Sequence, residues 1–206
     1  MNLESNEITF VIVSFKSEKI IFNCINSLPK NSKIIVIENS YNTNLKNDLE
    51  NKYDNIEVIL NNNSGMGSSN NIGIKKSTTK YVFILNPDVV FQHNTYSNLL
   101  EGIKKIDDFS ILSPINDNPR YPNYHIQNKY ISQNENILEV DSVDGFSMLL
   151  NKSKFDNQNF FDENFFLYLE NTDLCLRQKN KNEKIYIICN SKIKHIGSYT
   201  TKFDTS

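Results

Sequence analysis

The sequence predicts an α/β protein with a mostly parallel central sheet flanked by helices. Apolar, β-branched runs at residues 8–13, 33–37, 56–60 and 81–85 alternate with polar segments of helical length. Strand, helix and strand recur within about 30 residues, which is the size of a right-handed βαβ unit. The run at 81–85 is apolar throughout, as expected for a central strand that is covered on both faces.

Composition narrows the class of protein. The chain has 206 residues and a net charge of −2, which suits a single α/β domain and gives no electrostatic argument for nucleic-acid binding. Cys24, Cys175 and Cys189 lack metal-type spacing, so we interpret them as reduced thiols of a cytoplasmic protein. No apolar run approaches the roughly 20 residues that span a bilayer, so membrane association is expected to be peripheral at most.

The first half of the chain has clear helix signals. Ser17 is predicted to cap a helix that ends near Leu28, before a proline. A polar helix is expected at residues 42–53, and another ends at Ser77 after the glycine-containing stretch 61–73. Each of these helices separates two of the apolar runs, so the order of elements is that of a parallel sheet.

The second half is less regular. A helix is expected at residues 94–105, and residues 116–134 are interpreted as a long surface loop. The remaining predicted strands are at 109–114, 140–143, 145–150 and 184–189. A last helix is predicted at 174–181, and residues 170–173 lead into it.

Three strand ends carry polar side chains that should meet at one edge of the sheet: Ser14, Glu38 and Asp88. Pro87 ends the strand 81–85 because it has no N–H for the sheet ladder. In open α/β sheets ligands bind at this carboxyl edge, and a carboxylate there suits Mg²⁺ or Mn²⁺ bridging to a phosphate. Capping of the next helix explains Asp88 equally well.

Two further stretches contain candidate binding or catalytic residues. Gly65 and Gly67 would let backbone approach an anion at a helix N-terminus, although an ordinary loop with a helix cap is the simpler interpretation. Glu170 and Asp173 stand at a helix start, where both simple capping and a general base are compatible with the sequence. His195 precedes a Gly-Ser pair and is either a metal or phosphate ligand or a structural histidine.

Taken together, the motifs resemble family-2 glycosyltransferases of the GT-A fold, and are most similar to the rhamnosyltransferase-like branch. The resemblance runs from residue 8 to residue 198 and rests on VIVSF at 11–15, VIENS at 36–40, NSGMG at 63–67, NNIG at 70–73, LNPD at 85–88, FFLYLE at 165–170, DLCLR at 173–177 and HIGS at 195–198.

The resemblance implies a nucleoside-diphosphate sugar as donor. By it, Ser14, Phe15 and Glu38 would line the nucleoside pocket, and the carboxylate of Glu38 could accept from the ring imide N–H of uracil or thymine. The metal on the diphosphate would be bound by Asp88, with His195 as a further metal or diphosphate contact.

The remaining implied contacts flank the nucleotide. They come from Asn71 and the backbone of Gly65 and Gly67. The family's D-x-D motif appears here as residues 86–88, with Asn86 in the first position and one carboxylate left for the metal.

The resemblance fails at one catalytic position. The usual Glu-Asp pair is Glu170-Asn171 here, and an amide does not accept a proton at neutral pH. Glu170 or Asp173 would therefore have to act as the base. We favour Glu170, because the preceding apolar residues would raise its pKa.

The resemblance implies one domain, residues 1–206, whose nucleotide-sugar-binding half is about 8–90 and whose acceptor and catalytic half is about 91–198. It would be an inverting, metal-dependent enzyme that uses a UDP- or dTDP-linked sugar, with dTDP-rhamnose as one candidate. The acceptor would be a glycan or lipid-linked molecule in cell-surface polysaccharide synthesis. A location at the inner face of the membrane and a homodimer are compatible with this function.

Two alternatives stay open. The first is a catalytically silent nucleotide-sugar-binding subunit, which Asn171 favours. The second is a nucleotidyltransferase of related fold. Against it, this sequence has no early glycine-rich loop with a basic residue after the first predicted strand.

Overall fold

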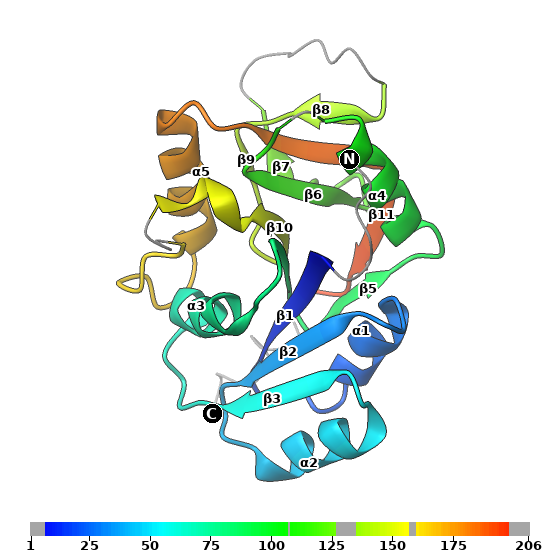
Figure 1. Ribbon diagram of the computed structural model, residues 1–206, viewed down its shortest axis with the longest axis vertical. Helices are drawn as coiled ribbons and strands as arrows, with labels where there is room; N and C mark the ends of the chain where they lie inside the picture. Colours follow the sequence, from blue (N-terminus) through cyan, green and yellow to red (C-terminus); the bar gives the residue numbers. More distant parts are fainter. Residues whose placement is uncertain (1–6, 107, 127–134, 157–159, 198–206) are drawn as a thin grey trace.

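The computed structural model describes residues 7–106, 108–126, 135–156 and 160–197, with helices on both faces of a mixed sheet (Figure 1). The strands are β1 (Ile8–Ser14), β2 (Lys33–Glu38), β3 (Ile56–Leu60), β4 (Tyr81–Leu85), β5 (Val89–Phe91), β6 (Ile111–Asn116), β7 (Tyr124–His125), β8 (Ile137–Glu139), β9 (Ser142–Val143), β10 (Ser147–Asn151) and β11 (Ile185–His195). The α-helices are α1 (Ile21–Ser27), α2 (Thr43–Lys52), α3 (Met66–Lys76), α4 (Thr95–Lys104) and α5 (Glu170–Asn180), and Lys152–Lys154 form a 3₁₀ turn.

The large sheet confirms the predicted α/β class. Its strand order is β3-β2-β1-β4-β10-β6-β11-β5, and β8 pairs with β11 beside this path. Strands β3, β2, β1 and β4 are parallel, and β6 is parallel to β11. A small separate sheet joins β7 to β9.

Two hydrophobic cores lie on opposite faces of this sheet. Phe10 and Ile12 of β1 belong to the core that contains residues of α1, α2 and α4. Val11 and Val13 belong to the core with Ile74 of α3 and residues of α5. Because side chains alternate along a strand, β1 supplies both cores. In Figure 1, α3 and α5 accordingly lie on the left, and α1 and α4 on the right.

Strand β4 is central, as the sequence predicted, and every one of its residues is buried. It pairs parallel with β1 on one side and antiparallel with β10 on the other. An antiparallel strand begins where its neighbours end, and Ser147 at the start of β10 lies opposite Leu85 at the end of β4. The residues that precede β10 therefore lie at the carboxyl edge of the sheet.

Several predicted boundaries are wrong. Helix α1 begins at Ile21, because the hydroxyl of Ser17 bonds to the backbone of Phe15 instead of capping the helix. Helix α3 begins at Met66, so part of the predicted glycine loop is helical.

Further boundaries shift in the second half. Helix α5 begins at Glu170, four residues earlier than predicted, and β11 continues as far as His195. The long loop contains the short strand β7, and residues 127–134 of it lie outside the described residues.

A glycine sets the distance between α3 and β1. A Cβ atom added at Gly73 would lie 2.4 Å from Cγ1 of Val11, whose side chain is fully buried. Real Cβ contacts do not occur at this separation, so a larger residue would force the helix away from the sheet.

We predict that Gly73→Ala lowers the free energy of unfolding by about 1–3 kcal/mol, the usual cost of overpacking a core. This loss should outweigh the 0.5–1 kcal/mol or so by which alanine favours a helix. Urea denaturation measures the change. Val11→Ala removes the obstructing methyl groups, so the double variant should be more stable than the sum of the single effects predicts. Strictly additive effects would contradict the proposed contact.

Candidate functional site

The predicted convergence of strand ends is present in the fold. Ser14 and Glu38 are register partners at the carboxyl ends of β1 and β2, and both side chains are fully buried. Asp88 follows β4 by three residues and is also buried. Because β2, β1 and β4 are parallel neighbours, the three side chains belong to one edge of the sheet.

Oγ of Ser14 and Oε2 of Glu38 are buried at this edge and have no hydrogen-bond partner among the residues that the structure describes. The other carboxylate oxygen of Glu38 accepts from the backbone N–H of Ser40 at 2.8 Å and from its hydroxyl group. Leaving a buried polar atom unpaired costs about 1–3 kcal/mol, so a ligand that supplies hydrogen-bond partners here would be favoured.

Asparagine and serine side chains fix the positions of these strand ends. The N–H of Asn39 donates to the carbonyl of Ser14 at 2.7 Å. Oδ1 of Asn39 accepts from Nδ2 of Asn61 at 2.7 Å and from the hydroxyl of Ser69 at 2.8 Å. This network joins β1, β2, α3 and the residue after β3. Sequence reasoning missed it, although asparagines directly after β2 and β3 were its signal.

Phe15 continues from β1 into a turn at the same edge. Its ring is half-buried, and Nζ of Lys16 lies 5.4 Å from the ring centroid. Lys16 has a φ of +49°, so the turn depends on a left-handed residue.

Asp88 contacts His195. Oδ2 of Asp88 lies 3.3 Å from Nε2 of His195 and accepts from the N–H of Gly197 at 3.1 Å. Antiparallel pairing of β11 with β5 places His195 opposite Val89. Capping of α4 by Asp88 is excluded, since that helix begins seven residues later, at Thr95.

The segment that enters β10 lies beside this pair. The ring of Phe146 stacks on the imidazole of His195 with centroids 3.9 Å apart. The N–H of Asn86 donates to the carbonyl of Phe146 at 3.0 Å. Two residues earlier, burial raises the pKa of the Asp144 carboxyl, while His125 and His195 act in the opposite direction. Sequence reasoning missed Asp144, and its only local signal was the neighbouring Gly145.

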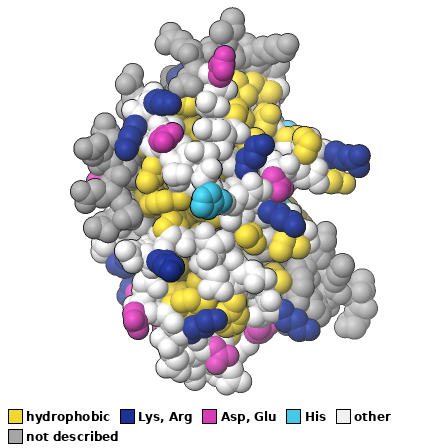
Figure 2. All heavy atoms as spheres, turned by 90° about the vertical axis from the view of Figure 1, so that its right-hand side faces the viewer, with side chains coloured by type: hydrophobic (Ala, Val, Ile, Leu, Met, Phe, Trp, Pro, Cys, Tyr) yellow, Lys and Arg dark blue, Asp and Glu magenta, His cyan; other side chains and the backbone are white. Residues whose placement is uncertain are grey.

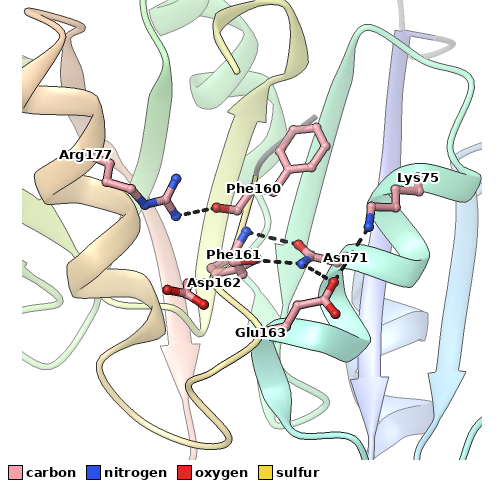
Figure 3. Close-up of a pocket in the computed structure, with 7 residues that line it drawn as sticks. All are labelled: Asn71, Lys75, Phe160, Phe161, Asp162, Glu163 and Arg177. Carbon is pink, nitrogen blue, oxygen red and sulfur yellow. Dashed lines mark hydrogen bonds and ion pairs between the residues drawn. The ribbon is translucent and has the colours of Figure 1, made fainter. Parts of the chain in front are cut away.

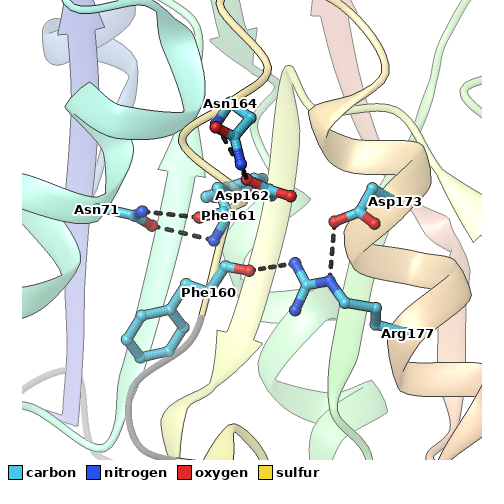
Figure 4. A network of polar contacts seen from close by, with 7 residues as sticks. All are labelled: Asn71, Phe160, Phe161, Asp162, Asn164, Asp173 and Arg177. Atoms are coloured by element: carbon cyan, nitrogen blue, oxygen red, sulfur yellow. Dashed lines mark hydrogen bonds and ion pairs between the residues drawn. The ribbon is translucent and has the colours of Figure 1, made fainter.

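The two predicted bases have different surroundings. Glu170 is the first residue of α5 and is buried beside α3, where a Cβ at Gly67 would lie 3.5 Å from its own Cβ. Burial raises its pKa, and its Oε2 has no described partner. Asp173 instead accepts from Nε of Arg177 at 2.8 Å (Figure 4). Neither carboxylate makes a described contact with Asp88 or His195.

The N-terminus of α3 is covered by another segment. The N–H of Met66 donates to the carbonyl of Phe166 at 2.9 Å. Gly65 has a φ of +89°, and a Cβ there would lie 2.4 Å from the same oxygen. Glycine is therefore required, but close approach of the 160–169 segment accounts for it without an anion.

Asn71 also binds this segment. Its Oδ1 accepts from the N–H of Phe161 at 3.0 Å, and its Nδ2 donates to the carbonyl of Phe161 at 2.8 Å and to Glu163 at 2.9 Å (Figures 3 and 4). The amide group thus joins α3 to the segment before α5. This leaves its predicted nucleotide contact without support from the geometry.

A cavity of about 350 Å³ lies between α3, α5 and this segment (Figure 3). Among its charged residues, Lys75 pairs with Glu163 at 3.6 Å, and Arg177 pairs with Asp173, which lies outside the lining. Neither Asp88 nor His195 lines this cavity. It is lined by Asn71, Lys75, Phe160, Phe161, Asp162, Glu163 and Arg177.

The surface is mixed in character on the face shown in Figure 2. In the described part of this face, Lys, Arg, Asp and Glu side chains stand among hydrophobic and uncharged atoms, without one continuous area of a single sign. Of the described helices, none is long and apolar enough to cross a membrane.

Asp88 and His195 are the candidate ligands of a divalent metal. No group of three or more His, Cys, Asp and Glu side chains is arranged to bind an ion within the described residues. Asp88 and His195 nevertheless place a carboxylate oxygen and an imidazole nitrogen 3.3 Å apart. Mg²⁺ typically keeps several waters and is bound by one or two carboxylates plus substrate phosphates, so two protein donors fit an ion carried with a diphosphate.

Curated relatives are sugar transferases. The chain is 25% identical over 199 residues to the low-salt glycan biosynthesis hexosyltransferase Agl10 of Haloferax volcanii, covering 87% of this chain and 64% of that protein. It is 28% identical over 201 residues to rhamnosyltransferase WbbL of Escherichia coli K12, covering 81% and 75%. The chain thus spans less than two thirds of the length of Agl10.

Solved structures share the fold. GalNAc-T7 with UDP, GalNAc and Mn²⁺ matches with a TM-score of 0.78 and 16% identity, over 92% of this chain and 44% of that one. S. aureus TarS 1-349 in complex with UDP-GlcNAc matches with a TM-score of 0.68 and 17% identity, over 95% and 60%. These are GT-A glycosyltransferases, so the predicted GT-A fold is confirmed.

The sequence model of glycosyl transferase family 2 matches residues 9–188, which include Ser14, Glu38 and Asp88. The chain therefore belongs to glycosyl transferase family 2.

Proposed function

We propose that this protein transfers a sugar, with inversion, from a nucleoside-diphosphate donor to a glycan or lipid-linked acceptor. The observation that carries the proposal is the carboxyl edge of the sheet, which holds both the Asp88–His195 pair and the unpaired buried oxygens of Ser14 and Glu38. Relatives named hexosyltransferase and rhamnosyltransferase support sugar transfer in glycan synthesis. A UDP- or dTDP-linked sugar is the proposed donor, with dTDP-rhamnose as one candidate.

The nucleoside would bind over β1 and β2. Oε2 of Glu38 is free to accept from the imide N–H that uracil and thymine share, and Oγ of Ser14 lies on the paired strand. The half-buried ring of Phe15 would cover one side of the base. In this proposal, residues of about 8–90 would bind the nucleotide sugar, and residues of about 91–198, which include His195, would form the acceptor and catalytic half.

Asp88 and His195 would hold Mg²⁺ or Mn²⁺, which would supply positive charge to the departing diphosphate. Phe146 stacks on His195 and the N–H of Gly197 bonds to Asp88, so both side chains are held in place by the protein itself. A ligand fixed in this way needs no rearrangement when charge develops on the leaving group.

The alternative is a catalytically silent subunit that binds nucleotide sugars. Asn171 keeps it open, because an amide stands where the resemblance implies a base. A panel of UDP-, dTDP-, GDP- and CDP-linked sugars separates the two functions. Calorimetry with Mn²⁺ measures binding, and release of the nucleoside diphosphate measures turnover. Turnover supports the transferase, whereas binding without turnover of any sugar supports the silent subunit.

We predict that Asp88→Asn weakens Mn²⁺-dependent binding of a nucleoside diphosphate by at least about tenfold. Even residues that only support a metal ligand typically change metal affinity 10- to 100-fold. Calorimetry with and without Mn²⁺ measures the effect. Asp156→Asn is the matched control, because its side chain is exposed and paired with Lys181. Unchanged Mn²⁺ dependence in Asp88→Asn would remove Asp88 from the site.

We also predict that UDP and dTDP bind about tenfold or more tightly than CDP. A hydrogen bond to a charged group contributes about 1.5–3 kcal/mol, and each 1.4 kcal/mol or so is tenfold in affinity. Cytosine has no ring N–H for Oε2 of Glu38, so it would lose this bond. Glu38→Gln should reduce the preference, with thermal unfolding as the check on folding. Equal affinities for all three nucleotides in the wild type would refute the assignment.

A further inference from the structure

Asp144 lies at the same edge of the sheet as Asp88, although it belongs to the second half of the chain. Strand β10 runs antiparallel to β4 and begins opposite Leu85, so the residues before it approach the end of β4. The hydrogen bond from Asn86 to the carbonyl of Phe146 fixes this approach at 3.0 Å. Phe146 in turn stacks on His195.

The residues on both sides of Asp144 contact Asn171. Nδ2 of Asn171 donates to the carbonyl of Val143 at 3.1 Å. A Cβ added at Gly145 would lie 3.2 Å from the Cβ of Asn171, so the segment and the first turn of α5 are in close contact. Asp144 therefore supplies a carboxylate beside an amide that does not itself accept protons.

The surroundings of Asp144 suit a side chain that takes part in a reaction. Its backbone is fixed, because its N–H donates to the carbonyl of Asn123 at 2.9 Å. No hydrogen bond of its carboxylate is described, so the oxygens are available to a ligand. Burial raises the pKa of this carboxyl, and the nearby His125 and His195 lower it. A raised pKa brings a carboxylate closer to the range of an effective general base.

The two carboxylates of α5 are placed less favourably. Residues two apart on a helix point to nearly opposite sides, so Asp173 lies away from the face of α5 that bears Asn171. Asp173 is also paired with Arg177. Glu170 is buried beside Gly67 of α3.

We propose that Asp144 is the general base of the transfer reaction, an inference that rests on the proposed function. Its carboxylate takes the proton of the acceptor hydroxyl as that oxygen forms a bond to the anomeric carbon. The bond from the anomeric carbon to the phosphate oxygen breaks at the same time. The nucleoside diphosphate leaves with the electron pair, and Asp144 ends the step protonated.

Asp144→Asn keeps the size of the side chain and removes its basicity. Losing a general base costs about 10²- to 10⁴-fold in turnover with little change in donor affinity. The donor is the nucleotide sugar that wild type turns over in the panel, with water as the acceptor. Calorimetry measures donor affinity, release of nucleoside diphosphate measures turnover, and thermal unfolding verifies the fold.

The rate of the reaction with azide distinguishes a general base from a residue that only positions the donor. Azide is an anionic nucleophile with no proton to lose, so its reaction with the donor does not need a base. We expect the glycosyl azide to form at similar rates in wild type and Asp144→Asn, while hydrolysis falls in the variant. A parallel loss of both reactions would overturn the base assignment.

Three further variants complete the test. Asp156→Asn makes the same chemical change at an exposed site and should leave turnover unchanged. Asn171→Asp, combined with Asp144→Asn, returns a carboxylate to the contacting residue and should recover part of the hydrolysis. Glu170→Gln tests the base predicted from sequence, and a larger loss there than in Asp144→Asn would overturn the proposal.

The proposed function and this inference fail separately. A wild-type protein that binds donors but turns over none refutes both the transferase and its base. A wild-type protein that turns over a donor, with Asp144→Asn close to it in rate, refutes only the role of Asp144.

Discussion

The carboxylate of Asp88 links segments that are far apart in the chain, since it accepts a hydrogen bond from the N–H of Gly197, 109 residues away. This contact depends on the pairing of β11 with β5, which brings His195 opposite Val89. Pro87 contributes by ending β4, so that the chain turns before β5 begins. The candidate metal ligands are therefore brought together by sheet pairing rather than by proximity in sequence.

The antiparallel strand β10 determines what else reaches this edge. A parallel sheet collects only residues that follow its strands at the carboxyl edge, as Ser14 and Glu38 do here. Insertion of β10 beside β4 adds the residues that precede a strand, Asp144 and Phe146 among them. This edge thus combines groups from the first half of the chain with groups from the second half.

Segment 160–169 connects α3 with α5 through backbone contacts. Asn71 bonds to Phe161, and the start of α3 bonds to the carbonyl of Phe166. The segment nevertheless exposes several large apolar side chains, including Tyr168 at 63% and Leu169 at 61%. Both of these residues have positive φ, a conformation that is costly for non-glycine residues. Burial of Glu170 therefore comes from its packing beside α3 and not from a closed apolar cover.

The sequence by itself determined the α/β class, the buried strand β4 and the edge that holds Ser14, Glu38 and Asp88, because strand periodicity and a terminal proline are local signals. Tertiary structure alone decided that α5 begins at Glu170, that Asn71 bonds to Phe161, and that the residues on both sides of Asp144 contact Asn171. These features depend on pairings between distant segments and on the direction of β10. No local pattern encodes that direction, since parallel and antiparallel buried strands have the same apolar composition.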